Sequence, residues 1–303
     1  MLTYEQKIKN LSVPKGMIDV VIDTDAYNEI DDQFAITYLL KSKEKLNTKA
    51  IYAAPFYNTN STGPADGMEK SYNEIFKLLD LMDEKYDVFR GSTTYLTDEK
   101  TPVISDAALD LAERVKNYSP ENPLYILAIG AITNVASAML INPEVATNSV
   151  LVWLGGHSRD YHDTNEFNMA QDVAAARVVM SSGVPFIQLP CQGVVSAFTM
   201  PEKDLEYWFK GKNKISDYLA NNVIREANSY AAGLPWTRII WDVTAVAWLL
   251  NDNNRFMFSR LCPIRLPGYD NKYEEAESDV MTYVYYILRD CIMTDLVNKI
   301  TAN

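Results

Sequence analysis

The stretch VVIDTDAYNEIDDQFA (Val20–Ala35) joins an apolar run to a helix-forming segment through a loop rich in carboxylates. Met17–Ile22 predicts a buried strand, and Asp31–Leu40 predicts a helix. A buried strand followed directly by a helix is the start of a parallel-sheet unit. Ligands of such sheets bind at the carboxyl ends of the strands, so these carboxylates lie where a binding site is expected.

The same alternation continues along the chain. Further strands are predicted at Ala50–Ala54, Val88–Arg90, Leu124–Ala128, Ser149–Leu154 and Pro185–Leu189, and helices at Asp66–Met82, Asp106–Lys116, Ala131–Leu140 and Asp172–Ser181. The later part predicts a mostly helical Pro201–Ala232, a helix at Trp241–Leu250, strands at Phe256–Leu266 and Met281–Ile287, and a helix at Cys291–Ile300. This pattern is typical of an α/β fold, with a mostly parallel, open, Rossmann-type sheet flanked by helices. No linker-like segment divides the chain, so we expect a single domain over residues 1–303.

Composition narrows the classes of function. The chain has 303 residues, 48% of them hydrophobic, with 28 Lys and Arg against 40 Asp and Glu, giving a net charge of −12. Such a chain can bury a sizeable core, and its acidity argues against nucleic-acid and anionic-membrane partners. No signal-like or membrane-length apolar run occurs, and the three cysteines are far apart, so we expect a cytoplasmic protein without disulfides.

The acidic loop points to a cation. Asp23 and Asp25, two positions apart, share a face of the strand end, whereas the adjacent Asp31 and Asp32 diverge at the helix start. Clustered carboxylates repel each other, raise one another's pKa or bind a cation, and oxygen ligands favour Ca²⁺ or Mg²⁺. The plainer alternative is a solvated loop with helix-capping aspartates.

Two known families open with an apolar strand and Asp-x-Asp. A haloacid-dehalogenase-type, Mg²⁺-dependent phosphohydrolase would use Asp23 as the nucleophile. The inosine–uridine preferring nucleoside hydrolases follow this motif with a pair of aspartates, as Asp31-Asp32 does here.

Three further motifs resemble the nucleoside hydrolases and occur in that family's order. They are LAIGAITNVASAML (Leu127–Leu140), VWLGGH followed by NEFNMAQDVAAA (Val152–Ala176), and WDVTAVAWLL (Trp241–Leu250). In the second motif, a strand-like backbone would aim Glu166 and Asn168 in one direction, and a helix start is the alternative. Asp172 is expected to cap the next helix.

The resemblance implies calcium-dependent hydrolysis of the N-glycosidic bond of ribonucleosides, giving free base and ribose. It places Ca²⁺ on Asp25, Asp32, the main-chain carbonyl of Ile129, and Asp242. Asp25 would also activate the water, and Asp23 would support the metal ligands from behind. The ribose would be bound by Asp31, Asn58, Glu166 and Asn168. The resemblance also implies a homodimer or homotetramer. The binding partner it implies is a small molecule, the nucleoside substrate.

The chain departs from this family at several positions. Many members carry a catalytic His before the last Asp, where this chain has Trp241, as does a purine-preferring branch in which the indole stacks on the base. We therefore expect a purine preference and count Trp241 among the catalytic and substrate-binding residues. Other candidates for the base pocket or for the leaving-group acid are His157, His162, Tyr230 and Arg238.

Two loops also differ from the family. Tyr27–Glu29 enlarges the acidic loop, because Asp25 and Asp31 are six positions apart instead of four. Asn60 is an alternative to Asn58, and Asp160 or Asn165 could replace a missing Asn. These departures keep a non-catalytic ribose- or nucleoside-binding protein open as an alternative.

Overall fold

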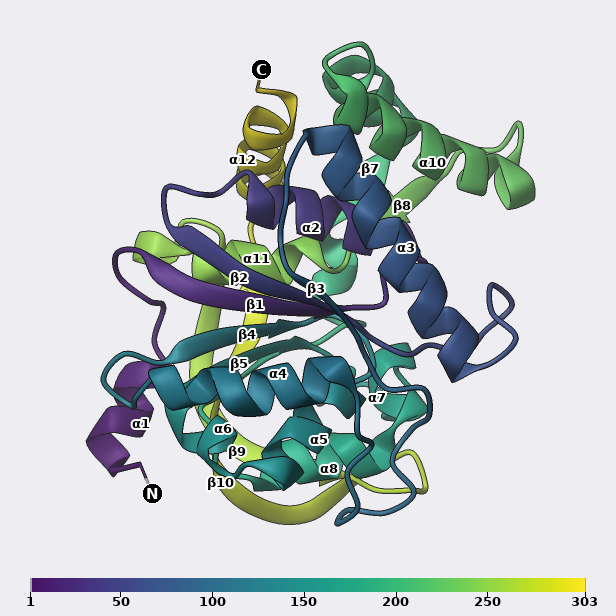
Figure 1. Cartoon of the computed structure of the whole chain (residues 1–303). Helices are drawn as coiled ribbons and strands as arrows, with labels where there is room; N and C mark the ends of the chain where they lie inside the picture. Colours follow the sequence, from purple (N-terminus) through teal and green to yellow (C-terminus); the bar gives the residue numbers. More distant parts are fainter. Residues whose placement is uncertain (1, 303) are drawn as a thin grey trace.

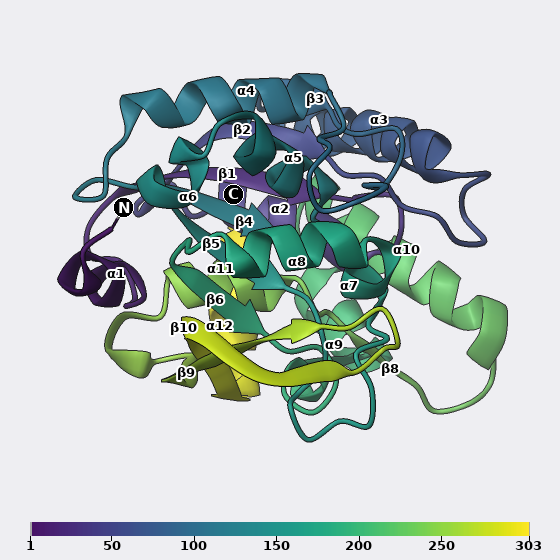
Figure 2. The ribbon, with the colours of Figure 1, turned by 90° about the horizontal axis from the view of Figure 1, so that it is seen from below.

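The computed structural model describes residues 2–302, with side chains throughout except at 276–278. Within these residues an eight-stranded sheet has the order β3-β2-β1-β4-β5-β6-β10-β9, with helices on both faces (Figures 1 and 2). Neighbouring strands are parallel from β3 to β10, and β9 runs antiparallel to β10. The predicted α/β fold with a mostly parallel sheet is therefore confirmed.

The strands of this sheet alternate with helices as far as β6. The strands are β1 (Ile18–Thr24), β2 (Leu46–Ala53), β3 (Val88–Arg90), β4 (Leu124–Ala128), β5 (Ser149–Leu154), β6 (Phe186–Leu189), β9 (Met257–Pro267) and β10 (Tyr273–Ile287); β7 (Thr199–Pro201) and β8 (Thr237–Ile239) form a separate antiparallel pair. The helices are α1 (Tyr4–Asn10), α2 (Asp31–Leu40), α3 (Pro64–Met82), α4 (Asp106–Arg114), α5 (Thr133–Ile141), α6 (Glu144–Asn148), α7 (Phe167–Gln171), α8 (Val173–Ser181), α9 (Glu202–Asp204), α10 (Lys214–Ala231), α11 (Val243–Leu249) and α12 (Arg289–Thr301), with short 3-10 turns at Val115–Asn117, Val195–Ala197 and Asp252–Asn254 and a π-helical turn at Leu205–Phe209.

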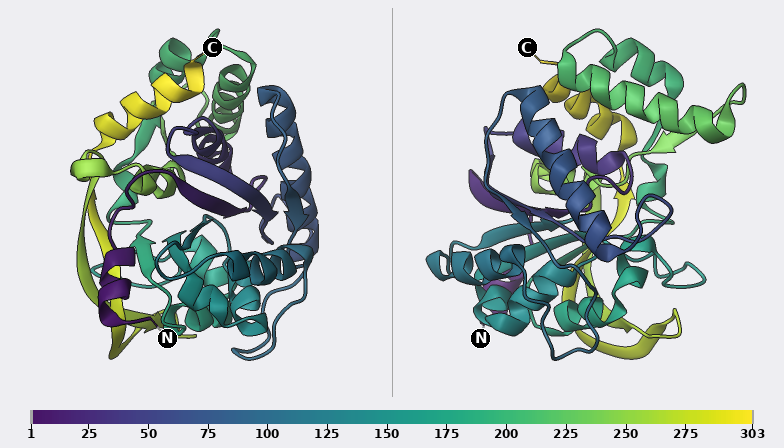
Figure 3. Two further views of the ribbon diagram at one scale, coloured as in Figure 1. Left: turned by 60° about the vertical axis from the view of Figure 1, so that its left-hand side comes forward. Right: turned by 45° about the vertical axis from the view of Figure 1, so that its right-hand side comes forward.

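Each face of the sheet has its own hydrophobic core. Helices α2, α3, α10, α11 and α12 lie on one face and α4, α5, α6 and α8 on the other (Figure 1), and the buried side chains form one cluster on each face. All ten residues of α2 are buried, because α11, α3 and α12 surround this helix on the sheet (Figure 3). A helix buried on all sides needs no amphipathic pattern, and α2 accordingly carries apolar residues around most of its circumference.

Some elements differ from those predicted. Pro201–Ala232 is not mostly one helix: β7, α9 and the π-helical turn occupy its first part, and α10 begins only at Lys214. Strand β7 exists because it pairs with β8, about forty positions later, and such a distant pairing leaves no local pattern. Within residues 2–302, no helix is both long and apolar enough to cross a bilayer.

Candidate functional site

A cavity lies at the carboxyl ends of the central strands and collects most of the predicted site residues. Those that line it are Asp25, Asp31, Asp32, Ile129, Glu166, Asn168, Trp241 and Asp242. The sequence interpretation did not assign a site role to five others, Asn28, Glu29, Leu154, Phe167 and Cys191, and it named His157 and Asn165 only as alternatives. The cavity is therefore at the edge of the sheet where ligands of parallel α/β proteins bind.

Three elements bring the carboxylates together. Asp25 directly follows β1, Asp31 and Asp32 form the first turn of α2, and Asp242 directly precedes α11. Because α2 packs against α11, carboxylate oxygens of Asp31, Asp32 and Asp242 lie within 4.8 Å of one another. This trio contains Asp31, which the resemblance assigned to the ribose. It does not contain Asp25, which the resemblance assigned to the metal.

Asp25 is the most exceptional carboxylate of the cavity. Both of its oxygens are buried, and neither has a hydrogen-bond partner among the residues that the structure describes. A Cβ at Gly130 would lie 3.0 Å from Asp25 Oδ1, so the glycine after β4 gives this carboxylate the space it occupies. Buried polar atoms are nearly always hydrogen-bonded, so two unpartnered oxygens indicate that a ligand belongs beside them.

Burial and mutual repulsion raise the pKa of these carboxylates. Burial followed by the charges of Asp32 and Asp31 raises the pKa of Asp25 well above its ordinary value. The pKa values of Asp31 and Asp242 rise in the same way, and burial raises the pKa of Asp32 to about 7. A cation among them would remove this repulsion, and a group of carboxylates fits a hard cation such as Ca²⁺ or Mg²⁺.

Asp23 lies behind this group and does not line the cavity. Its Oδ1 accepts a hydrogen bond of 2.7 Å from Asn134 Nδ2, and its Oδ2 is buried without a partner in residues 2–302. Burial raises the pKa of Asp23 to about 7, opposed by the Asn134 bond. Its predicted supporting role stays a prediction that suits this position.

Of the two backbones considered around Glu166, the structure has the helix start and not the strand, and the capping residue is Glu166 itself and not an asparagine. Glu166 caps α7, and its carboxylate accepts hydrogen bonds from the main-chain N–H groups of Asn168, Met169 and Gly156 at 2.8–2.9 Å. The Glu166 side chain thus satisfies N–H groups at the start of α7, which is what an N-capping residue does. Asn168 Nδ2 donates to the carbonyls of Leu154 and Ile129, at 3.0 and 3.3 Å, so it lies beside the predicted metal-binding carbonyl.

Asn58 is set back from the cavity, unlike the other predicted ribose-binding residues. Its Nδ2 donates to Asn28 Oδ1 at 2.5 Å, and Asn28 is the residue that lines the cavity. Asn60 supports the same loop by donating to the Asn28 carbonyl. The length of the acidic loop was the only sequence signal for Asn28.

Of the candidates for the base pocket and for the leaving-group acid, two line the cavity and three do not. Trp241 is half-buried and lines the cavity, as does the buried His157, whose Nδ1 accepts from Gln192 N at 3.3 Å. His162 and Tyr230 are exposed and lie outside the lining, and Arg238 pairs with Glu29 at 2.5 Å. His157 is therefore the imidazole that faces this cavity.

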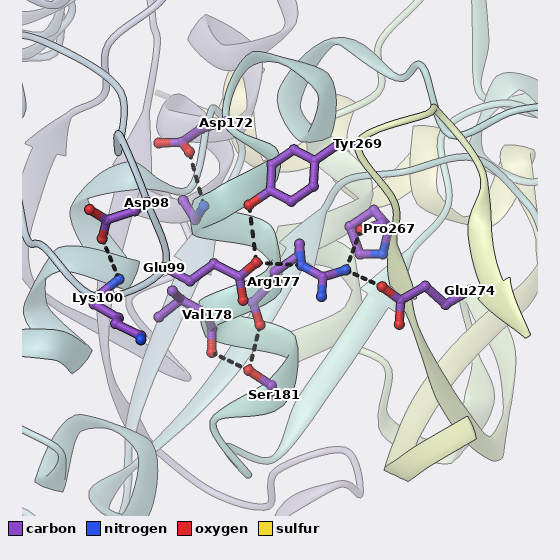
Figure 4. Close-up of polar contacts among 11 residues, drawn as sticks. Asp98, Glu99, Lys100, Asp172, Arg177, Val178, Ser181, Pro267, Tyr269 and Glu274 are labelled. Carbon is purple, nitrogen blue, oxygen red and sulfur yellow. Dashed lines mark hydrogen bonds and ion pairs between the residues drawn. The ribbon is translucent and has the colours of Figure 1, made fainter. Parts of the chain in front are cut away.

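A polar network anchors the segments that flank α7 and α8 (Figure 4). Asp172 caps α8, as predicted, by accepting from Ala175 N, and it also accepts from Leu96 N. Arg177 of α8 donates to Glu99 at 2.6 Å and to the Pro267 carbonyl at 3.0 Å, and it pairs with Glu274. These bonds fasten the β3–α4 loop and the β9–β10 hairpin to α8.

Comparisons with known proteins find relatives of this chain in sequence and in fold. The sequence profile described as inosine-uridine preferring nucleoside hydrolase matches residues 20–284. The non-specific ribonucleoside hydrolase RihC of Salmonella agona is 25% identical over 259 residues, which cover 77% of this chain and 78% of that protein. A plant nucleoside hydrolase, PpNRh1, has a similar structure, with a TM-score of 0.74, 20% identity, and coverage of 96% of this chain and 100% of that one.

The fold is also similar to that of a purine-preferring ribonucleoside hydrolase from Gardnerella vaginalis. The TM-score is 0.73 at 19% identity, and the alignment covers 93% of this chain and 98% of that one.

Proposed function

Because the chain belongs to the inosine-uridine preferring nucleoside hydrolase family and is thus a glycosyl hydrolase, we propose that it releases base and ribose from ribonucleosides, with calcium and with a preference for purines. The observation that carries the proposal is Asp25, a buried carboxylate that has no hydrogen-bond partner within residues 2–302 and shares the cavity with Asp31, Asp32 and Asp242. The family match does not favour a phosphohydrolase with Asp23 as nucleophile, and Asp23 lies outside the cavity.

We propose that Asp25, Asp32, Asp242 and the Ile129 carbonyl hold Ca²⁺, which fits a ligand set made only of oxygen atoms. When bound, this cation would lower the pKa of a coordinated water and polarise ribose hydroxyls. Asp25 would also accept a proton from the water that attacks C1 of the ribose, so its two oxygens, unpartnered within residues 2–302, could serve both ligation and proton transfer.

The ribose is held by acceptors on the cavity wall. Asp31 accepts a hydrogen bond from one ribose hydroxyl, and Glu166 and Asn168 contact another part of the sugar. Glu166 is fixed by three main-chain N–H groups, so it does not move when substrate arrives. As the C1–N bond breaks, positive charge develops on the sugar, and the surrounding carboxylates stabilise that charge electrostatically.

The base leaves with the electron pair of the broken bond. Trp241 stacks on it, and the larger purine ring gains more from stacking than a pyrimidine does, which supports a purine preference. No histidine precedes Asp242, so a proton reaches the base from solvent or by way of His157, the imidazole at the cavity.

The test measures ribose release from inosine, adenosine, guanosine and uridine, before and after stringent treatment with EDTA and after Ca²⁺ is returned. We expect purine nucleosides to be hydrolysed faster, activity to vanish with EDTA, and Ca²⁺ to restore it. A clear uridine preference would contradict stacking on Trp241, and activity that survives metal removal would contradict the metal site. Saturable binding without turnover of any nucleoside would instead show a non-catalytic relative.

We also propose a cytoplasmic homodimer or homotetramer, following the family resemblance. Light scattering on the eluate of a size-exclusion column tests the assembly, and a monomer at micromolar concentration would contradict it.

A further inference from the structure

The enlarged loop between Asp25 and Asp31 brings an amide into a cavity whose polar wall is mostly carboxylate. Asn28 is only 6% exposed and lines the cavity together with Asp25, Asp31 and Glu29. Carboxylates only accept hydrogen bonds when ionised, whereas an amide can also donate. Two other amides line the cavity, those of Asn165 and Asn168, and Asn168 already donates to two carbonyls.

A chain of hydrogen bonds fixes which end of the Asn28 amide faces the ligand. The main-chain N–H of Asn60 donates to Asn58 Oδ1 at 2.8 Å, and because a main-chain N–H can only donate, this bond sets the orientation of the Asn58 amide. Asn58 Nδ2 therefore donates to Asn28 Oδ1, at 2.5 Å. No hydrogen bond from Asn28 Nδ2 occurs in the described part of the chain, so this group remains available to a ligand in the cavity that Asn28 lines.

The main chain around Asn28 is held as firmly as its side chain. Asn28 N donates to the Asp25 carbonyl at 2.7 Å, and the Asn28 carbonyl accepts from Asn60 Nδ2 at 2.9 Å. On the C-terminal side, Glu29 pairs with Arg238 of β8 at 2.5 Å. The donor is therefore preorganised, and substrate binding does not have to order it.

On the basis of the proposed function, we infer that Asn28 is a ribose-binding residue that donates a hydrogen bond from Nδ2 to a 2′- or 3′-hydroxyl oxygen of the substrate, and that Asn58 positions it. A ribose hydroxyl that donates its proton to a carboxylate keeps lone pairs that need a donor. Asn28 supplies that donor from the loop that also begins with Asp25. The longer loop thus places an amide in the cavity from which Asn58 itself is set back.

The experiment compares wild type with Asn28→Ala and Asn28→Asp on inosine, 2′-deoxyinosine and 3′-deoxyinosine. Asn28→Asp keeps an oxygen for Asn58 but loses the N–H donor, so it tests the donor even if Asn28→Ala folds poorly. We expect each substitution to lower kcat/KM for inosine by about tenfold or more, as for a lost hydrogen bond in a dry site. The loss should disappear on the analogue that lacks the contacted hydroxyl.

Asn58→Ala should give a smaller loss with the same dependence on that hydroxyl, because Asn28 then keeps its donor but not its fixed orientation. The matched control is Asn73→Ala, which removes an exposed amide on α3 that donates only to Glu69 O. It should match wild type.

Equal losses on all three nucleosides, or no loss in either Asn28 variant, would overturn the inference. Calorimetric titration of each nucleoside into wild type and variants gives the same comparison without turnover. Failure of the proposed function appears separately, as absence of hydrolysis by the wild type, while binding still tests the role of Asn28.

Discussion

Asp23→Asn should stabilise the metal-free protein, and by more at high pH than at low pH. Burial raises the pKa of Asp23 from 3.8 in the unfolded chain to about 7 in the folded protein. The unfolded state therefore releases this proton at lower pH than the folded state, and stability falls as pH rises from about 4 to about 7. Compared with a group that does not titrate, Asp23 lowers the free energy of unfolding by about 2 kcal/mol at pH 5 and by about 4 kcal/mol at pH 8.

An amide carries no such penalty, and it keeps an oxygen for the 2.7 Å bond from Asn134. The stabilisation by Asp23→Asn should therefore be larger at pH 8 than at pH 5 by about 2–3 kcal/mol. Any cost of placing an amide nitrogen at the position of Oδ2 is the same at both pH values and cancels in this difference.

The assay is urea unfolding in EDTA at both pH values, followed by circular dichroism. Asp80→Asn, an exposed position on α3, is the control and should show no comparable pH-dependent change. A stability difference between wild type and Asp23→Asn that is equal at pH 5 and pH 8 would refute the reasoning, because it would mean that Asp23 does not carry a buried charge.

Three further predictions address the cavity and its support. Asp25→Asn should keep the fold, since neither oxygen has a hydrogen bond to lose among the described residues, but should abolish nearly all ribose release; a variant with more than about a tenth of wild-type turnover would contradict the role of Asp25 as the base. Trp241→Ala should lower kcat/KM for inosine by about tenfold, the order expected for a lost stacking contact, and should affect uridine less; equal effects on both nucleosides would argue against stacking. Arg177→Gln should lower the free energy of unfolding by about 1 kcal/mol, because it removes the ion pairs with the partly exposed Glu99 and Glu274, while Glu99 keeps its hydrogen bond from Tyr269 Oη. The kcat should be unchanged, since Arg177, Glu99 and Glu274 do not line the cavity; thermal unfolding and steady-state kinetics on the same sample check both statements.

The parts of the fold that could be predicted are those with a local signature. Leu124–Ala128 and Ser149–Leu154 match β4 and β5 at both ends, because strands buried on both faces are continuously apolar. The pairing of Met200 with Arg238 in β7 and β8 depends on a contact far along the chain, and no local pattern revealed it.

The site shows the same division. The order of the motifs was enough to predict that Asp25, Asp31, Asp32 and Asp242 meet at one cavity. It was not enough to predict that Asn28 lines the cavity while Asn58 supports Asn28 from behind. This arrangement depends on the hydrogen bonds among Asn28, Asn58 and Asn60, which the sequence does not show. The sequence placed Glu166 at this cavity but left its backbone open between a strand and a helix start, since a cap and a strand end share the same extended conformation at that residue.

The complete burial of α2 has a consequence for how the protein loses activity on heating. In many enzymes the catalytic loops melt before the rest of the molecule. Here Asp31 and Asp32 are the first turn of a helix enclosed by the core, so they cannot be released without opening that core. Amide hydrogens of α2 beyond its first turn should therefore exchange with solvent through global unfolding, and inactivation and loss of tertiary structure should occur at the same temperature.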